Sequence, residues 1–445
     1  MTFAYRLIGG GTGRRGSHRS AKRMPAAKGV TFAAPWLVQR PTIAPMTNRV
    51  LIAAGLCCLV SGPCLAQTPG TPFQCQPMTC SSLVPSLPVD DASTNDCAYR
   101  AGNLWWVDYV AGSLTWHDHA PVKPIIVAVF DDGAYIDHEE IRNQLWTNEA
   151  EAHGKTGADD DGNGYVDDLH GWDFVDNSPD VAPKGECSGR VSHGTLMASL
   201  IAAQRNNGTG IAAPGSDGAR LMILRVVGCH PGVNDDANPE RLTRALDYAT
   251  RMGAQILSFS SHWNATTPEL DKAFAEIAER RDATHPAIVV ASVPNKGEPQ
   301  AGYPAAYTFR RIIRAIPIGN DDMISPGTTV APPGINLGAP SACVIGAGLP
   351  PDHYRVEQGS SNSTAILSGL LAGIWSSPPY AKLSTDEFLA RVVQGRMVAS
   401  SRRSKPGSRT PYLDGVPLAD ACLLETERRK ARVCPQPGSQ REPRP

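Results

Sequence analysis

Apolar runs alternate with segments of helical character between about residues 121 and 400. Continuous apolar runs predict strands buried on both faces of a sheet, at Ile125–Phe130, Leu221–Val227, Ile256–Phe259 and Ile288–Ala291. Helices are predicted between and after them, at His193–Ala203, Pro239–Met252, Pro268–Arg280 and Ser361–Trp375. This alternation predicts an α/β fold in which helices cover both faces of a mostly parallel sheet.

Residues that favour helix N-termini mark where three helices begin. Asn238 and Thr267 each precede a proline, which is tolerated in the first helical turn. Residues 384–387 have the Ser-x-x-Glu pattern of a capping box, which opens a further helix. We therefore expect helices to start directly after these residues.

The first 66 residues differ in character from the rest. Arg49, the apolar stretch Val50–Val60 and the small residues up to Ala66 form the pattern of a signal peptide, over residues 46–66. The apolar stretch is shorter than the about 20 residues that span a bilayer, so we expect no stable membrane span. The pattern predicts a secreted or periplasmic protein. Because Met46 can itself start translation, the sequence leaves open whether the basic extension 1–45 is translated.

Composition divides the remainder into three parts. Residues 67–120 are a Cys- and Pro-rich arm, residues 121–425 carry the α/β pattern, and residues 426–445 are a Pro- and Arg-rich tail expected to be disordered. After residue 49 the chain has 33 basic and 43 acidic residues, and this excess of negative charge disfavours nucleic acid as a partner. Eight cysteines follow the predicted signal peptide, an even number that predicts disulfides in an exported chain but leaves their pairing open.

Four polar residues stand at the ends of predicted elements. Asp131 follows the first strand, Asn295 follows the strand at 288–291, and His193 and Ser361 begin helices. The carboxyl ends of parallel strands meet at one edge of a sheet, where α/β proteins build their sites. A carboxylate, an imidazole, a hydroxyl and an amide are the groups that activate a serine and bind the oxyanion it creates.

In their order along the chain, which is Asp, His, Asn and Ser, the four segments resemble the motifs of the subtilisin-like serine peptidases, or subtilases. The Asp-Asp-Gly, His-Gly-Thr and Gly-Ser-Ser segments carry the resemblance, together with Asn206–Pro214 after the His-bearing helix. A weaker similarity at Tyr412–Leu424 extends it to the end of the domain. The resemblance implies a subtilisin-like three-layer α/β fold and an endopeptidase, expected to be a monomer, that hydrolyses proteins or peptides.

The resemblance also implies a role for each residue. Ser361 is the expected nucleophile, His193 the general base and then acid, and Asp131 the group that orients the imidazole. The Asn295 side chain and the Ser361 N–H are expected to bind the oxyanion. Neighbouring residues of the same types are alternatives that the motif register disfavours, namely Asp132 and Asp137 for the acid and Ser360 and Ser363 for the nucleophile.

Two motifs depart from the family pattern. The predicted substrate-binding residues Ser260, Ser261 and His262 stand where the family has Ser-Leu-Gly, so an imidazole is expected to narrow the pocket. The nucleophile segment continues Asn-Ser-Thr-Ala where Met-Ala-Ser-Pro is usual. These departures leave a second interpretation open, a catalytically weak or inactive subtilase-like binding protein. A lipase or esterase is disfavoured, because those enzymes use a Gly-x-Ser-x-Gly elbow and the order Ser, Asp, His.

An acidic loop between the Asp and His motifs predicts a structural calcium site. Oxygen-bearing residues alternate through it as in an EF-hand loop, with a glycine at the sixth position; the predicted ligands are Asp159, Asp161, Asn163, Tyr165 and Asp167. The twelfth position is His170 instead of the usual glutamate. Many bacterial subtilases carry a similar insertion, and a solvated acidic turn is the alternative interpretation.

Overall fold

A computed structural model describes most of the chain from Thr94 to Ala421: residues 94–116, 123–185, 192–230, 233–235, 238–295, 301–319, 321–329, 331–350, 353–399, 403–405 and 416–421. The predicted signal peptide, the extension before it, the tail and residues 412–415 lie outside the described residues. The chain divides into two units, 1–62 and 63–445, and all described residues belong to the second.

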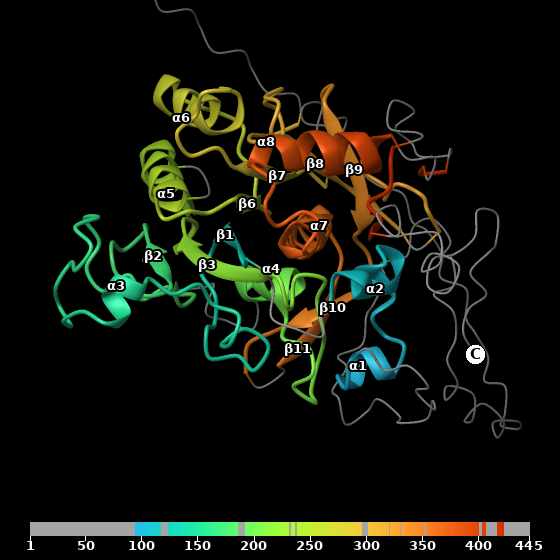
Figure 1. The fold of residues 1–445 in the computed structure, drawn as a ribbon, viewed down its shortest axis with the longest axis horizontal. Helices are drawn as coiled ribbons and strands as arrows, with labels where there is room; N and C mark the ends of the chain where they lie inside the picture. The colour runs from blue at the N-terminus through green and yellow to red at the C-terminus, as the bar shows by residue number, and fades with distance from the viewer. Residues whose placement is uncertain are drawn as a thin grey trace, which may run out of the picture. The chain divides into compact units, whose positions relative to one another are not determined.

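A seven-stranded parallel sheet forms the centre of the described unit (Figure 1). Its strands follow the spatial order β2-β3-β1-β6-β7-β8-β9. Their bounds are Gly171–Asp173 (β2), Ala219–Arg225 (β3), Ile125–Asp131 (β1), Ile256–Phe259 (β6), Ile288–Ser292 (β7), Ile312–Ile318 (β8) and Ile335–Pro340 (β9). All residues of β7 and β8 are buried, as expected for parallel strands covered on both faces.

Strand β1 lies inside the sheet, between β3 and β6. Asp131, its last residue, is in register with Arg225 at the end of β3, and Phe130 with Phe259 at the end of β6. The rings of Phe130 and Phe259 stack with their centroids 4.2 Å apart. This packing holds the end of β1 firmly at the edge where parallel strands of this sheet finish.

Helices lie on both sides of the sheet (Figure 1). In the figure, α4 and α7 pack together beside the strands, and α5 and α6 lie together on the other side of β1, β3 and β6. The bounds are His193–Ala202 (α4), Pro239–Arg251 (α5), Pro268–Ala278 (α6), Ser360–Ser376 (α7), Thr385–Phe388 (α8) and Leu389–Val398 (η4, a π-helical segment). The predicted α/β class with helices on both faces is confirmed.

Helix starts agree closely with the capping residues. The side chain of Asn238 accepts from the Arg241 N–H, and that of Thr267 accepts from the Leu270 N–H. Ser384 and Glu387 form the predicted capping box at the start of α8. Short polar side chains thus bind the N–H groups that the first helical turn leaves without intrahelical partners.

Several strands were not predicted from the sequence. They are β8 and β9 at the sheet's edge and two hairpins, which consist of Gly228–His230 (β4) with Val233–Asp235 (β5) and Val344–Ala347 (β10) with Tyr354–Glu357 (β11). The β10–β11 hairpin joins the sheet region to α7. It also contacts α4, where the Ala347 N–H donates to the Ser199 hydroxyl at 2.9 Å.

Residues 94–116, within the predicted arm, form short helices that pack on the domain. Their bounds are Cys97–Arg100 (α1), Trp105–Tyr109 (α2) and Gly112–Thr115 (η2), and Glu149–Ala152 (α3) is a similarly short helix further on. Trp106 is fully buried, and the Trp105 indole donates to the Cys343 carbonyl at 3.0 Å. The boundary predicted near residue 120 falls in the undescribed stretch 117–122 and stays a prediction. No helix in the described ranges combines the length and apolarity needed to cross a bilayer.

Candidate active site

The carboxylate of Asp131 and the ring of His193 meet where β1 ends and α4 begins. His193 Nδ1 lies 2.9 Å from each of the two carboxylate oxygens of Asp131. Because a carboxylate only accepts, Nδ1 carries the proton in the neutral form of the ring, and in that form Nε2 keeps its lone pair. Asp131 is buried, whereas 39% of the His193 side chain is exposed, so the ring is held from inside and open on its outer edge.

Asp132, the rival acid in the sequence, is engaged with the backbone of α4. Its carboxylate accepts from the N–H groups of His193 at 3.0 Å and Gly194 at 2.7 Å. It therefore binds the first N–H groups of the helix that carries the imidazole, whereas ring Nδ1 is bound by Asp131. Burial, followed by the nearby charge of Asp131, raises the pKa of Asp132 to about 6. The other rival, Asp137, is exposed to solvent.

The two carboxylates act together on the imidazole. Burial lowers the pKa of His193, but the charge and hydrogen bond of Asp131 and the charge of Asp132 outweigh it and raise that pKa to about 9. The charge of Arg355, on β11, acts in the opposite direction. The neutral ring, which alone can accept a proton, therefore becomes the main form only in alkaline solution.

Two glycines allow the loop after β1 to approach α4 closely. A Cβ on Gly194 would lie 2.0 Å from the Gly133 carbonyl oxygen. Gly133 has φ +97°, and a Cβ there would lie 2.5 Å from the Val181 carbonyl oxygen. The glycines of the Asp-Asp-Gly and His-Gly segments are thus required by close backbone contact.

Of the three neighbouring serines Ser360, Ser361 and Ser363, only Ser361 is partly exposed. Ser360 and Ser363 are buried, and the Ser363 hydroxyl donates to the Ala339 carbonyl at 2.8 Å. The Ser361 hydroxyl donates to the Ser260 carbonyl at 3.0 Å, and no hydrogen bond between described residues joins it to His193. Catalytic hydrogen bonds are often long in the free protein and tighten only when substrate binds.

Asn295 lies beside the start of α7. Its Oδ1 accepts from the Ser360 N–H at 2.9 Å, which fixes the orientation of the amide. Its Nδ2 donates to no described residue and is available to an oxyanion. The N–H of Ser361 lies in the first turn of α7, where N–H groups have no intrahelical acceptor. The structure thus brings together the two expected oxyanion donors.

The three predicted substrate-binding residues follow β6. Ser260 is buried and exchanges hydrogen bonds with Ser361, its hydroxyl donating to the Ser361 carbonyl at 3.3 Å; Ser261 and His262 are half-buried. The His262 ring occupies the space beside Gly302, where a Cβ would lie 2.8 Å from ring Cδ2. The next residue, Trp263, pairs with Tyr303 through two backbone hydrogen bonds. An imidazole therefore fills space that a glycine at this position would leave open.

The acidic loop brings some of its predicted ligands together. Carboxylate oxygens of Asp159, Asp161 and Glu151 lie within 4.8 Å of one another. Asn163 donates its amide to Asp161 at 3.0 Å. Asp167 instead accepts from the Gly157 N–H at 2.8 and 3.0 Å. Glu151 was missed because it lies on α3, outside the repeating loop pattern.

Aromatic and amide side chains pack against this loop and form hydrogen bonds with it. The Tyr165 ring makes edge contacts with the rings of Trp172 and Tyr248, with centroid distances of 5.0 Å and 4.9 Å. Buried Asp168 accepts from the Tyr248 hydroxyl at 2.5 Å and from the Asn148 amide at 2.9 Å. The donor set is oxygen-rich, with one amide and several carboxylates, and therefore fits a hard cation such as calcium.

Comparisons with known proteins identify the family of the chain. The model of the Subtilase family matches residues 123–414. The Major intracellular serine protease of Bacillus subtilis (strain 168) is 27% identical over 306 residues, which are 67% of this chain and 84% of that protein. Subtilisin-like protease 1 of Plasmodium vivax is 39% identical over 105 residues, or 23% of this chain. That match spans only 15% of the length of the Plasmodium protein.

A structural comparison supports the same assignment. Sphericase superposes with a TM-score of 0.51 at 20% identity, covering 71% of this chain and 97% of that one, a likeness that shows the fold. The chain belongs to the subtilase family and so to the serine-type peptidases, which are hydrolases. The subtilisin-like expectation from the sequence is confirmed.

Proposed function

We propose that this protein is an exported serine endopeptidase that cleaves protein or peptide bonds through an acyl-enzyme. The observation that carries the proposal is the bond from His193 Nδ1 to both oxygens of buried Asp131. It leaves Nε2 as a base at the sheet edge where α7 presents Ser361. Asp131 is the proposed orienting acid, His193 the base and Ser361 the nucleophile.

The chemistry follows from these positions. Ser361 Oγ attacks the substrate carbonyl carbon while His193 Nε2 takes the hydroxyl proton. The carbonyl oxygen becomes an oxyanion that accepts hydrogen bonds from Asn295 Nδ2 and the Ser361 N–H. The imidazolium then gives its proton to the leaving amine as the C–N bond breaks. Water, deprotonated by the same ring, hydrolyses the resulting ester and restores Ser361.

A peptide-library assay tests this function. Wild-type protein and Ser361→Ala are incubated with a mixed library of unmodified peptides, and products are identified by mass spectrometry. The proposal expects internal cleavage by the wild type and none by the variant. Absence of cleavage by folded wild type at alkaline pH would contradict it.

A peptidase-like binding protein is the second candidate, because the Ser361 hydroxyl is bonded to the Ser260 carbonyl and His262 fills the space beside Gly302. A protein of this kind retains peptides without cleaving them. In the library assay it would deplete a subset of peptides through binding, equally in wild type and Ser361→Ala. The pattern of products therefore separates the two functions.

Calcium is the proposed structural cofactor. Asp159, Asp161 and Glu151 supply carboxylates, and Asn163 and the Tyr165 carbonyl are the remaining proposed ligands on the loop, with Asp167 closing its turn. Bound calcium would neutralise carboxylates that otherwise repel one another. Removing it with a chelator is expected to lower the melting temperature, since an ion that binds only folded protein stabilises it by mass action.

Export is proposed from residues 46–66, whose basic start, apolar stretch and small residues form a signal-peptide pattern. The even number of cysteines after it is consistent with disulfides formed outside the cytoplasm. The Bacillus subtilis relative, the Major intracellular serine protease, is by its name a protein of the cell interior. Fractionation of cells that express the full chain, with N-terminal sequencing of the mature protein, tests export directly.

A further inference from the structure

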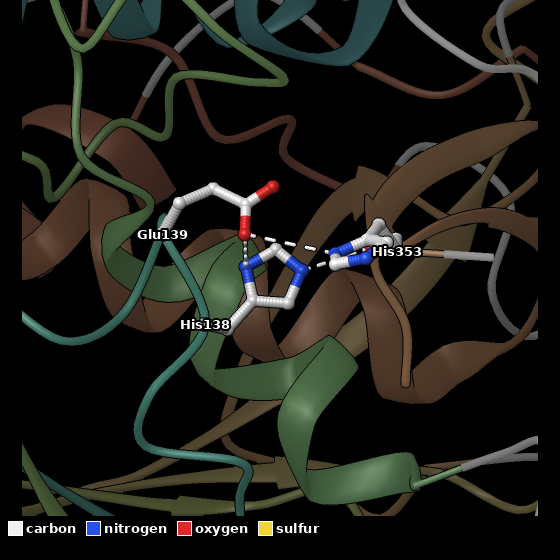
Figure 2. Close-up of side chains that lie close together, drawn as sticks. All are labelled: His138, Glu139 and His353. Carbon is white, nitrogen blue, oxygen red and sulfur yellow. Dashed lines mark hydrogen bonds and ion pairs between the residues drawn. The ribbon is translucent and has the colours of Figure 1, made fainter. Parts of the chain in front are cut away.

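Two histidines and a glutamate from distant parts of the chain meet on the side of the domain near β10 and β11 (Figure 2). His138 and Glu139 lie on the turn that follows the loop after β1, and His353 lies directly before β11. We propose that His138, Glu139 and His353 form a binding site for a divalent transition-metal ion such as Zn²⁺. The site is separate from the proposed catalytic residues and from the acidic loop.

The spacing of the ligand atoms supports the proposal. Glu139 Oε2 lies 3.5 Å from His138 Nδ1 and 3.7 Å from His353 Nδ1, and each of the three side chains has one ligand atom within 4.8 Å of a ligand atom of the other two. Ligands about 2.0–2.1 Å from a tetrahedral Zn²⁺ are separated by roughly 3.3 Å. Two of the three separations are close to this value, so a small movement of exposed His353 completes the geometry.

The buried histidine already has the tautomer that a metal ligand requires. His138 Nε2 donates to the His353 carbonyl at 2.9 Å, so Nδ1 carries no proton and keeps its lone pair, 3.5 Å from Glu139 Oε2 (Figure 2). Metal-binding histidines commonly donate their second nitrogen to such an acceptor. The Glu140 N–H also donates to Nδ1, at 3.2 Å, and the metal ion must replace this bond.

The surrounding residues hold the cluster in place. The Tyr354 hydroxyl lies 2.9 Å from Glu139 Oε1 and 2.8 Å from Glu140 Oε1, so the Glu139 oxygen that stays available to the metal ion is Oε2. The Tyr354 ring also makes an edge contact with the His138 ring at a centroid distance of 5.5 Å. His353 adopts a left-handed backbone with φ 47°, a conformation that non-glycine residues maintain at a cost and that often occurs at functional sites.

The donor types indicate which ions fit. Two imidazole nitrogens and one carboxylate oxygen suit Zn²⁺, Ni²⁺ or Cu²⁺, whereas Ca²⁺ and Mg²⁺ prefer oxygen ligands alone. His138 is buried, but 48% of the His353 side chain is exposed, which provides an entry path and room for a water ligand. The ion would join the segment after Asp131 to the hairpin that precedes Ser361, and so stabilise both.

Co²⁺ is a suitable probe because it replaces Zn²⁺ and absorbs visible light strongly when four-coordinate. The full chain carrying Ser361→Ala, which prevents self-cleavage, is kept in excess Ca²⁺ and titrated with Co²⁺. Glu139→Gln and His353→Ala are compared with His153→Ala. His153 is the matched control, since it is 81% exposed and also lies 3.5 Å from a glutamate, Glu149.

We expect one equivalent of Co²⁺ to produce four-coordinate absorption that Zn²⁺ abolishes by competition. Zn²⁺ should also raise the melting temperature of the parent and of His153→Ala. Glu139→Gln and His353→Ala should fold, shown by circular dichroism, and should bind Co²⁺ at least roughly tenfold more weakly. Co²⁺ binding that is absent in the parent, or unchanged in both cluster variants, would overturn the proposal.

Discussion

His193 Nδ1 is held by both carboxylate oxygens of Asp131, each at 2.9 Å, while Asp132 binds the backbone N–H of the same histidine at 3.0 Å. Adjacent acidic residues therefore act on different parts of one residue. The first fixes the ring and its tautomer, and the second fixes the helix start from which the ring projects. Because the two carboxylates bind different parts of His193, separate predictions follow for Asp131 and Asp132.

Replacing Asp131 with asparagine should remove most of the activity without unfolding the protein. The amide can stabilise the wrong tautomer and cannot balance the imidazolium charge, so kcat should fall by about 10⁴. Steady-state kinetics on a cleaved peptide give the measurement, and circular dichroism checks the fold. Asp137→Asn, at an exposed position, should change kcat by less than roughly twofold. Equal losses in the two variants would contradict the assignment of Asp131.

Activity should increase with pH well above neutrality. The pKa of His193 is raised from 6.5 to about 9, so the ring is mostly protonated at pH 7 and the neutral, proton-accepting form grows as pH rises toward 9. The profile of kcat/KM should therefore rise nearly tenfold per pH unit in the neutral range. A profile already flat at pH 7 would show that the ring titrates at a much lower pH.

Asp132→Asn should shift this profile toward lower pH. The charge of Asp132 helps to raise the pKa of His193, and the neutral amide still offers an oxygen to the N–H groups of α4. The acidic limb of the kcat/KM profile should shift to lower pH, while the limiting value of kcat/KM at high pH should change little. Thermal unfolding serves as the control for helix capping. An unchanged limb would show that Asp132 acts only on the structure of the helix.

The raised pKa of His193 should also appear in stability. A group whose pKa is higher in the folded state stabilises the fold fully below its unfolded value and loses this contribution as pH rises through its folded value. The expected window is therefore between pH 6.5 and about 9. The difference in melting temperature between wild type and His193→Ala should shrink across this window. A difference independent of pH would contradict the linkage.

His262→Gly should widen substrate choice. The His262 ring lies against Gly302, two residues after the Ser260 carbonyl that binds Ser361, and its removal opens space beside Gly302 for bulky side chains. We expect kcat/KM for peptides with a large apolar residue before the cleaved bond to rise roughly tenfold relative to peptides with a small one. The peptide library measures this ratio. An unchanged ratio would mean that His262 does not border the substrate.

The calcium proposal predicts a chelator effect that depends on one glutamate. EDTA should lower the melting temperature of the wild type by several degrees, and Glu151→Gln should reduce that shift. Glu149 is the matched control, because it lies on the same short helix but is 78% exposed and outside the carboxylate cluster. Glu149→Gln should respond like the wild type. A melting temperature that EDTA does not change would contradict the calcium proposal.

The sequence predicts the inner part of the sheet well and its edge poorly. β1, β6 and β7 are short, mostly apolar runs without an internal charge or proline, whereas β8 contains Arg314 and Pro317 and β9 contains Asn336 and Gly338. Arg314 is buried in β8, where its guanidinium donates to the Ala305 carbonyl at 2.6 Å. A buried guanidinium that binds backbone carbonyls, with Nη1 left without a partner among the described residues, interrupts the apolar pattern, so the strand is not visible from the sequence alone.

The candidate site shows the same limit. Motif register predicts Asp131, His193 and Ser361 as the catalytic residues, since each directly follows or begins a predicted element. It could not show that Asp132 binds the helix backbone, because both acids fit the same position in the motif. Nor could it connect His138 with His353, which are 215 residues apart and meet only in the folded chain.

Covalent labelling of Ser361 tests the central claim most directly. Folded protein is treated at pH 9 with a fluorophosphonate, which reacts with activated serines, and the modified residue is located by peptide mass spectrometry. The account predicts stoichiometric labelling of Ser361 in the wild type, labelling at least roughly a hundredfold slower in His193→Ala, and no labelling in Ser361→Ala. Label on Ser360 or Ser363, or no label on folded wild-type protein, would contradict it.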